Sequence, residues 1–272
     1  MSITVSQKYQ QSNTDFNWLA RSMSRAEFLK LRKRRGLFWT SLFLSLGAVL
    51  IYFAVLEILH IVSPAAHGSA GGNVNLTRAV NIMTLIGGTA AILVGANAGA
   101  GDSNGVFRDL VATGRSRVAL FFARIPGAIM MFWPMIIAAY VVAALVSVIL
   151  AGSYAVPTSA NLIHYGLIVL LSTSFELLLA IGVSSLTVSK SVTIAVLMAW
   201  EFIVQQLLLL ITWFGSFREI LPLSSIGRLS PHAGGPLRYV PGESTLVASL
   251  VLVGWIVVAT GVGVFKTKKM DA

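Results

Sequence analysis

The chain has 272 residues, of which 56% are hydrophobic and only 11% are charged, whereas an average soluble domain carries about 25% charged residues. The net charge is +10. Because the basic residues gather beside apolar segments, as is typical of membrane orientation signals, we expect no nucleic-acid partner. The absence of cysteine excludes disulfides, thiolate metal sites and cysteine nucleophiles.

Residues 1–35 are polar and basic and are predicted to form a cytoplasmic N-terminal segment. Within this segment, Trp18–Arg35 is predicted to be helical, and a Ser-x-x-Glu capping box that ends at Glu27 marks its first turn. Phe28 and Leu31 fall on one face of this helix, and basic residues fill the other face. The pattern predicts an amphipathic helix at the membrane interface. The alternative is a simple run of positive charge before the first span.

Residues 36–272 contain six apolar segments, each long enough to cross a bilayer as a helix. We therefore predict an all-α fold, a polytopic membrane protein with six transmembrane helices. Pro126 and Pro134 are candidate bend points in the third span. The predicted spans are Leu37–Val62, Ala79–Ala98, Val118–Ala151, Leu162–Val188, Val192–Phe214 and Thr245–Phe265.

Lys and Arg are distributed unevenly between the two sides of these spans. Sixteen of the 20 basic residues lie in or beside the N-terminal segment, the second and fourth connections, and the C-terminal tail. The other four lie on the opposite side. An even number of spans places both termini on the same side, and because positive charge is retained in the cytoplasm, both termini are predicted to be cytoplasmic.

A glycine-rich run, residues 95–101, ends the second span. A phosphate-binding loop requires a lysine after its second glycine, and no lysine follows here, so the chain is not expected to bind ATP by itself. Ala91, Gly95 and Gly99 recur every four residues. This spacing predicts the close approach of another helix.

Two acidic residues lie near the middle of predicted spans: Glu176 in the fourth and Glu201 in the fifth. A charge at bilayer depth costs at least about 2.5 kcal/mol, so both side chains are predicted to face protein or water. Gln205 follows Glu201 by one helical turn and extends a polar stripe. Two interpretations remain open: a lined pathway or ion-sensitive gate, and an interhelical hydrogen bond that holds the bundle together.

Two connections are too long to be simple turns. The external loop, 215–243, contains four prolines and is expected to be ordered by turns. The cytoplasmic loop, 99–117, contains a short predicted amphipathic helix that ends at Gly114 and would present an apolar knob to a partner protein. The knob and its polar rim comprise Val106, Phe107, Arg108, Asp109 and Leu110.

The N-terminal surface helix, the six spans and one loop motif together resemble permease subunits of type-2 ATP-binding-cassette (ABC) exporters. The motif is Gly-x-x-Arg-Asp-Leu-x-x-Thr-Gly-x-x-Arg, which runs from Gly105 to Arg117. Relatives often have Thr-Pro where this chain has Thr-Gly. The resemblance implies that Trp18–Arg35 is a connecting helix and that Val106–Thr113 is a coupling helix that docks on the ATPase. It also implies short helices that enter the outer leaflet before the last span.

The resemblance implies a membrane permease subunit of an ATP-driven exporter in a cell membrane, the cytoplasmic membrane of a bacterium. Its partners would be ABC ATPase subunits, a second permease copy or paralogue, and membrane lipid. ATP and magnesium would bind to the partner ATPase, with no cofactor or metal site on this chain and no enzymatic activity of its own. Members of the family export drugs, antibiotics, peptides, lipids or polysaccharides.

Two other functions remain open from the residues alone. One is an intramembrane enzyme in which Glu176, Glu201 and a histidine perform acid–base chemistry. The other is a channel or accessory membrane subunit without ATP coupling.

Overall fold

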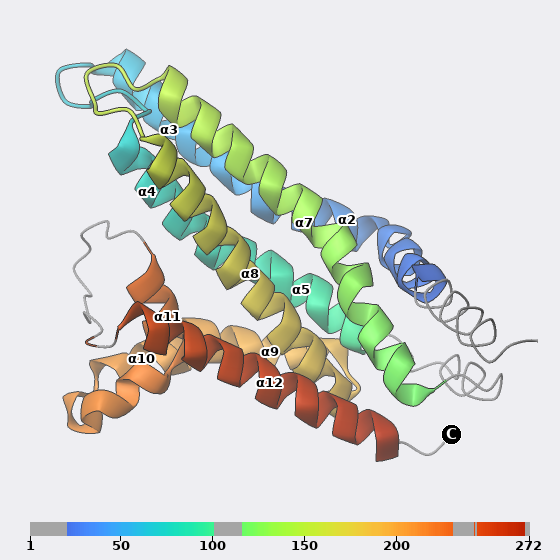
Figure 1. Ribbon diagram of the computed structural model, residues 1–272. Helices are drawn as coiled ribbons and strands as arrows, with labels where there is room; N and C mark the ends of the chain where they lie inside the picture. The colour runs from blue at the N-terminus through green and yellow to red at the C-terminus, as the bar shows by residue number, and fades with distance from the viewer. Residues whose placement is uncertain (1–20, 101–115, 231–241, 243, 270–272) are drawn as a thin grey trace, which may run out of the picture.

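The computed structural model describes residues 21–100, 116–230, 242 and 244–269. Over these residues the chain forms helices and no strand, which confirms the predicted all-α fold (Figure 1). Six helical segments of the described chain are long and apolar enough to cross a membrane. They are Arg35–Val62, Asn73–Gly99, Arg117–Ile149, Ser159–Thr187, Lys190–Leu210 and Thr245–Lys269.

Three of these segments are continuous α-helices, and the other three contain a π-helical turn. The continuous helices are α7 (Arg117–Ile149), α8 (Ser159–Thr187) and α12 (Thr245–Lys269). The first segment comprises α2 (Arg35–Leu42), η1 (Phe43–Gly47) and α3 (Ala48–Val62). The second comprises α4 (Asn73–Ile82), η2 (Met83–Gly87) and α5 (Gly88–Gly99). The fifth comprises α9 (Lys190–Ala199), η3 (Trp200–Val204) and α10 (Gln205–Leu210).

Local sequence explains where several of these helices begin. Side-chain oxygens of Ser116, Thr158 and Ser189 accept hydrogen bonds from backbone N–H groups in the first turns of α7, α8 and α9, respectively. Such caps satisfy donors that have no partner inside the helix. The second segment begins after Gly72, whose φ of +88° is a conformation that glycine adopts readily. It therefore starts six residues before the predicted Ala79.

The fifth segment ends earlier than predicted, and the chain then folds back on itself. Ile211 has extended backbone angles, so α10 stops at Leu210 instead of Phe214. A 3-10 helix, η4 (Thr212–Ile220), and a short α-helix, α11 (Pro222–Leu229), follow. The beginning of the predicted external loop is thus helical. Figure 1 shows α11 close to the start of α12.

Helix α8 lies at the centre of the packing because small residues let two other helices approach it. A Cβ atom added to Gly95 of α5 would lie 2.5 Å from the carbonyl oxygen of Leu177, and one added to Gly99 would lie 2.5 Å from that of Ile181. The predicted close helix contact at these glycines is therefore confirmed. At Gly182 of α8, an added Cβ atom would collide with the backbone of α12.

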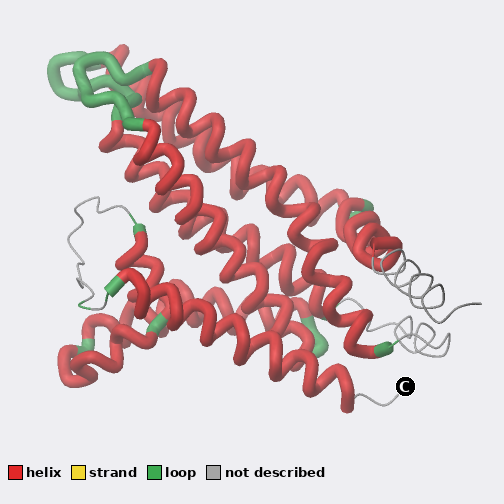
Figure 2. The backbone as a smooth tube through the Cα atoms, viewed as in Figure 1, coloured by secondary structure: helices red, strands yellow, loops and turns green. Residues whose placement is uncertain are grey.

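At one end of the bundle, two loops are joined by backbone hydrogen bonds. The N–H of Gly71 donates to the carbonyl of Leu150 (2.8 Å), and the N–H of Gly72 donates to that of Ser147 (2.7 Å). The hydroxyl of Ser69 also donates to the carbonyl of Ala151 (2.6 Å). Figure 2 shows these loops side by side at the end farthest from the C-terminus. They tie the end of the α2–α5 hairpin to the α7–α8 hairpin.

Candidate functional site

The helix that precedes the first segment packs against the third. Residues 21–32 are helical, and Leu31 is fully buried in the main hydrophobic core, with Phe28 packed against that core. The contact with α7 is made at Gly127. A Cβ atom added there would lie 2.7 Å from the Cβ of Glu27 and 3.0 Å from the backbone nitrogen of Phe28. Glycine at this position therefore permits direct backbone contact between the two helices.

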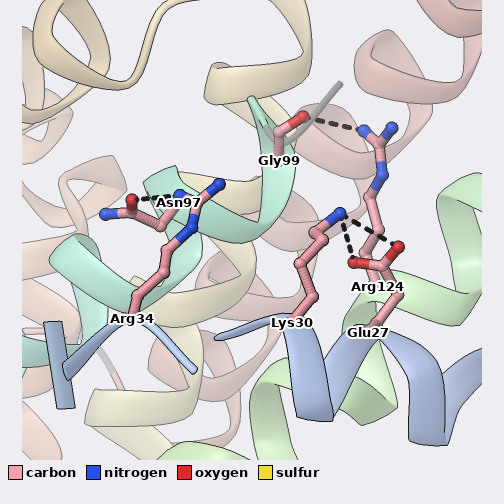
Figure 3. A network of polar contacts seen from close by, with 6 residues as sticks. All are labelled: Glu27, Lys30, Arg34, Asn97, Gly99 and Arg124. Atoms are coloured by element: carbon pink, nitrogen blue, oxygen red, sulfur yellow. Dashed lines mark hydrogen bonds and ion pairs between the residues drawn. The ribbon is translucent and has the colours of Figure 1, made fainter. Parts of the chain in front are cut away.

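Polar side chains reinforce this junction, and Figure 3 draws them from close by. The guanidinium of Arg34 donates to Oδ1 of Asn97 across 2.7 Å. The amide of Asn97 in turn donates to the carbonyl of Leu93, one turn earlier in α5 (2.8 Å). Nearby, Lys30 forms an ion pair with Glu27 at 2.8 Å. Arg34 is thereby attached to the last turn of α5.

The same junction includes a buried arginine from α7. Arg124 is 5% exposed, and its guanidinium donates to the carbonyl of Gly99 across 2.7 Å. The last carbonyls of a helix have no partner within the helix and carry partial negative charge. Arg124 therefore caps α5 at Gly99, the residue where the loop 99–117 begins. We call the contacts made by Glu27, Lys30, Arg34, Asn97, Gly99, Arg124 and Gly127 the basal junction.

Only the two ends of the loop 99–117 lie within the described residues. Val106, Phe107, Arg108, Asp109 and Leu110 fall within residues 101–115, outside the described residues. At the far end of the loop, Arg117 donates to the carbonyl of Lys268 in α12 (3.0 Å). Both ends of the loop are thus attached to neighbouring helices.

A second polar cluster lies halfway along the helices, on α8 and the fifth segment. Glu176 is 4% exposed, and its Cγ lies 3.5 Å from a Cβ atom built on Gly88 of α5. One of its carboxyl oxygens, Oε1, is buried without a hydrogen-bond partner. Glu201 lies close enough to Glu176 for the two carboxyl groups to interact electrostatically. The prediction that these residues face protein or water is confirmed for Glu176, which is buried in protein.

Gln205 connects this cluster to α11. It is fully buried, and its Nε2 donates to Oε2 of Glu201 across 2.6 Å. Its Oε1 accepts the backbone N–H of Leu223 across 2.9 Å. That N–H belongs to the first turn of α11, where donors have no partner within the helix. We call Glu176, Glu201 and Gln205 the mid-span cluster.

The π-helical turn η3 contains Glu201 and directly precedes Gln205. A π-turn inserts one residue into a helix and often occurs at functional sites. Neither this turn nor the contact with Leu223 is indicated by a pattern in the sequence. Pro222 was the available signal, because proline is favoured at the first position of a helix. It predicts that α11 begins there, but it does not predict which side chain caps the helix.

Across the described ranges, no three His, Asp or Glu side chains converge in a way that would hold a metal ion. No protein-family model matches the chain, and no match is found among curated proteins. The six apolar helices, the basal junction, the mid-span cluster and the loop motif are therefore the features that bear on function.

Proposed function

We propose that the chain is a polytopic membrane protein that serves as the permease subunit of an ATP-driven exporter. The six apolar helices and the paucity of charge support its placement in a membrane. The distribution of Lys and Arg supports cytoplasmic N- and C-termini, with residues 18–35 as an amphipathic helix at the interface. In this arrangement the basal junction faces the cytoplasm, and the loops at 63–72 and 150–158 face outward.

The basal junction is the observation that carries the proposal. A partner can drive the permease only through contacts that differ between its two states. The loop 99–117 would make these contacts, with Phe107 and Leu110 as the apolar knob. Because Arg124 holds the start of this loop and Arg34 holds the turn before it, displacement of the loop would move the N-terminal helix and the second and third spans together.

The mid-span cluster is the proposed pathway or gate. Buried carboxyl groups within spans are costly and commonly mark ion or substrate pathways. Gln205 links Glu201 to α11, so a movement of the fifth span would reach the outer segment between the last two spans. The chain itself would carry no catalytic residue. ATP and magnesium would act on the partner ATPase, and a second permease copy or paralogue would complete the pathway.

The test is reconstitution of the chain with an ABC ATPase from the same source. Phe107→Ala combined with Leu110→Ala should leave the chain inserted and folded, yet weaken ATPase association and abolish export. Interface anchors of this kind cost about 2 kcal/mol or more when truncated. The matched control is Phe43→Ala with Leu50→Ala, which removes exposed apolar side chains from the first span. Normal export by the loop variant at normal expression, or ATP hydrolysis by the purified chain alone, would contradict the proposal.

A further inference from the structure

Glu176 of α8 is an acidic side chain that is buried without compensation. It is 4% exposed, and its Oε1 is buried without a hydrogen-bond partner. No Lys, Arg or His side chain of the described residues lies within ion-pair distance of it. A carboxylate in such surroundings loses its hydration and gains no partner in return, whereas a neutral carboxylic acid loses far less. The surroundings of Glu176 therefore suit the neutral acid.

A second carboxyl group faces Glu176 from the fifth segment. Glu201, in the π-turn η3, is the charged group that acts electrostatically on Glu176. Two carboxyl groups that share a buried site resist carrying two negative charges at once. The elements packed against α8 and the fifth segment contain other ionisable side chains, and in the described chain none of these bonds to either carboxyl group. They are His164 and Tyr165 on α8 itself, Arg78 on α4, Arg117, Arg124 and Tyr140 on α7, Lys190 on α9, Arg218 and Glu219 on η4, Arg228 on α11, and Lys266, Lys268 and Lys269 on α12.

A metal ion is the competing occupant of this site, and the ligands that the site offers argue against it. Hard cations take about six oxygen ligands. The cluster supplies two carboxyl groups, and the amide oxygen of Gln205 already accepts the N–H of Leu223. A Cβ atom built on Gly88 would lie 3.5 Å from Cγ of Glu176, so the gap between these two residues is no wider than a methyl group. A proton needs neither further ligands nor a cavity.

We propose that the mid-span cluster binds a single proton, which Glu176 carries as a neutral carboxylic acid. The proton comes from water and returns to water, so one O–H bond is made on binding and broken on release. Glu201 remains the acceptor for Nε2 of Gln205, across 2.6 Å. This inference deepens the gate described above, and its role in export rests on the proposed function.

The proton also determines how α8 meets the fifth segment. When Glu176 releases it, two negative charges face each other, and both require water. Glu201 is only partly buried and lies in a π-turn, so the fifth segment moves away from α8 to admit that water. Gln205 transmits the movement to the first turn of α11 through its bond to Leu223. Because the closed arrangement binds the proton, it is favoured at low pH and is lost as pH rises.

Infrared spectroscopy detects the proton directly, because a neutral carboxylic acid has a C=O stretching band that a carboxylate lacks. The purified full chain, in a detergent without ester groups, should show this band at neutral pH, where exposed glutamates are ionised. Glu176→Gln should remove the band. Glu57→Gln, which changes a partly exposed carboxyl group near the end of the first segment, should keep it. Absence of the band from the wild type, or its persistence in Glu176→Gln, would overturn the proposal.

Thiol labelling tests the link between the proton and α11. Ser225 of α11 is fully buried and its hydroxyl has no hydrogen-bond partner, so Ser225→Cys breaks no hydrogen bond. Its labelling rate is divided by that of Ser153→Cys, at an exposed position, to remove the effect of pH on the thiol itself. The ratio should rise with pH by at most about ten-fold per pH unit, the slope set by the release of one proton.

The same two carboxyl variants serve as test and control in the labelling experiment. Glu176→Gln stays neutral, so it should keep the ratio low at every pH, whereas Glu57→Gln should keep the rise seen in the wild type. A ratio that does not change with pH in the wild type, or that rises equally in Glu176→Gln, would contradict the link to α11.

Export measurements separate this inference from the proposed function. ATP-driven export by a chain that lacks the carboxylic acid band would refute proton binding and leave the permease assignment in place. A band that depends on Glu176, in a chain that exports nothing with any partner ATPase, would refute the permease assignment and support the proton site.

Discussion

The amide of Gln205 donates to the carboxylate of Glu201 across 2.6 Å, one turn apart on the fifth segment. The other end of the same side chain accepts the N–H of Leu223 at the start of α11. One buried side chain thus joins an acidic residue at mid-span to a short helix 18 residues further along the chain. This geometry distinguishes Gln205 from its neighbour Gln206, which is exposed.

Replacing Gln205 by leucine should therefore destabilise the protein far more than the same change at Gln206. The substitution leaves the N–H of Leu223 and the carboxyl of Glu201 without their partner, and each unsatisfied buried group costs about 1–3 kcal/mol. We expect Gln205→Leu to lower the free energy of unfolding by about 3 kcal/mol, measured by thermal or denaturant unfolding in detergent. Gln206→Leu is the matched control. Equal stability of the two variants would show that the link to α11 contributes nothing.

Substitution of Glu176 can distinguish a role of this residue in a transport pathway from a purely structural role. Its Oε1 has no hydrogen-bond partner, so Glu176→Gln breaks no hydrogen bond at that atom and should keep the yield and melting temperature of the complex. Glu201→Gln retains a carbonyl oxygen that accepts from Gln205. If the two carboxyl groups line the pathway, each variant should change the export rate while assembly remains normal. Loss of stability without a specific loss of export would favour the structural interpretation.

The contact between Arg34 and Asn97 is expected to contribute to stability, because hydrogen bonds to a charged group are worth about 1.5–3 kcal/mol. A double-mutant cycle with Arg34→Met and Asn97→Leu should give an interaction energy of about 1–2 kcal/mol. Arg35→Met, at the exposed neighbouring position, provides the control and should show no coupling to Asn97. Additive effects of Arg34→Met and Asn97→Leu would mean that this bond does not fasten the N-terminal helix to α5.

Gly95 should not tolerate a side chain. An added Cβ atom would lie 2.5 Å from a carbonyl oxygen and 2.7 Å from the Cβ of Ala180, so α5 and α8 must separate to admit it. We expect Gly95→Ala to cost about 1–3 kcal/mol, the usual penalty of overpacking. Gly254 of α12 has no atom within 4 Å of the same position. Gly254→Ala should be neutral or slightly stabilising, because alanine favours helix. Comparable melting temperatures would contradict the tight contact.

Labelling of single cysteines tests the orientation without interference from native cysteine, which is absent. Ser153 and Ser191 are both exposed, in the loop after α7 and the first turn of α9, respectively. If both termini are cytoplasmic, Ser153→Cys should react with a membrane-impermeant thiol reagent in intact cells. Ser191→Cys should react only after the cells are permeabilised. The reverse pattern would overturn the orientation and remove the loop 99–117 from the cytoplasm.

The positions of the six long helices could be predicted because each depends on a continuous apolar run within one segment. The glycine contact was also predictable, since Ala91, Gly95 and Gly99 form their stripe on a single helix. Helix ends were less predictable where a few backbone angles decide them. The fifth segment, for example, stops because Ile211 is extended, and its apolar composition gives no sign of that change.

The basal junction and the mid-span cluster could be predicted only in part. Burial of Glu176 follows from the cost of placing a charge in hydrocarbon, a property of the residue and its span. The bond between Arg34 and Asn97 joins residues 63 positions apart, and the hydrophobic pattern does not specify which helices will become neighbours. The same limit applies to Gln205, because its second partner is a backbone group. Nothing in the identity of Leu223 marks it as the donor.

The paired loops beside Gly71 and Leu150 have a consequence for sequence divergence. Backbone groups make most of their hydrogen bonds, so side chains at this end can vary widely without separating the two hairpins. The exceptions are four glycines at which an added Cβ atom would collide with the facing loop: Gly68, Gly71, Gly72 and Gly152. The chemistry of this rim can therefore change with little effect on the spacing of the four helices behind it.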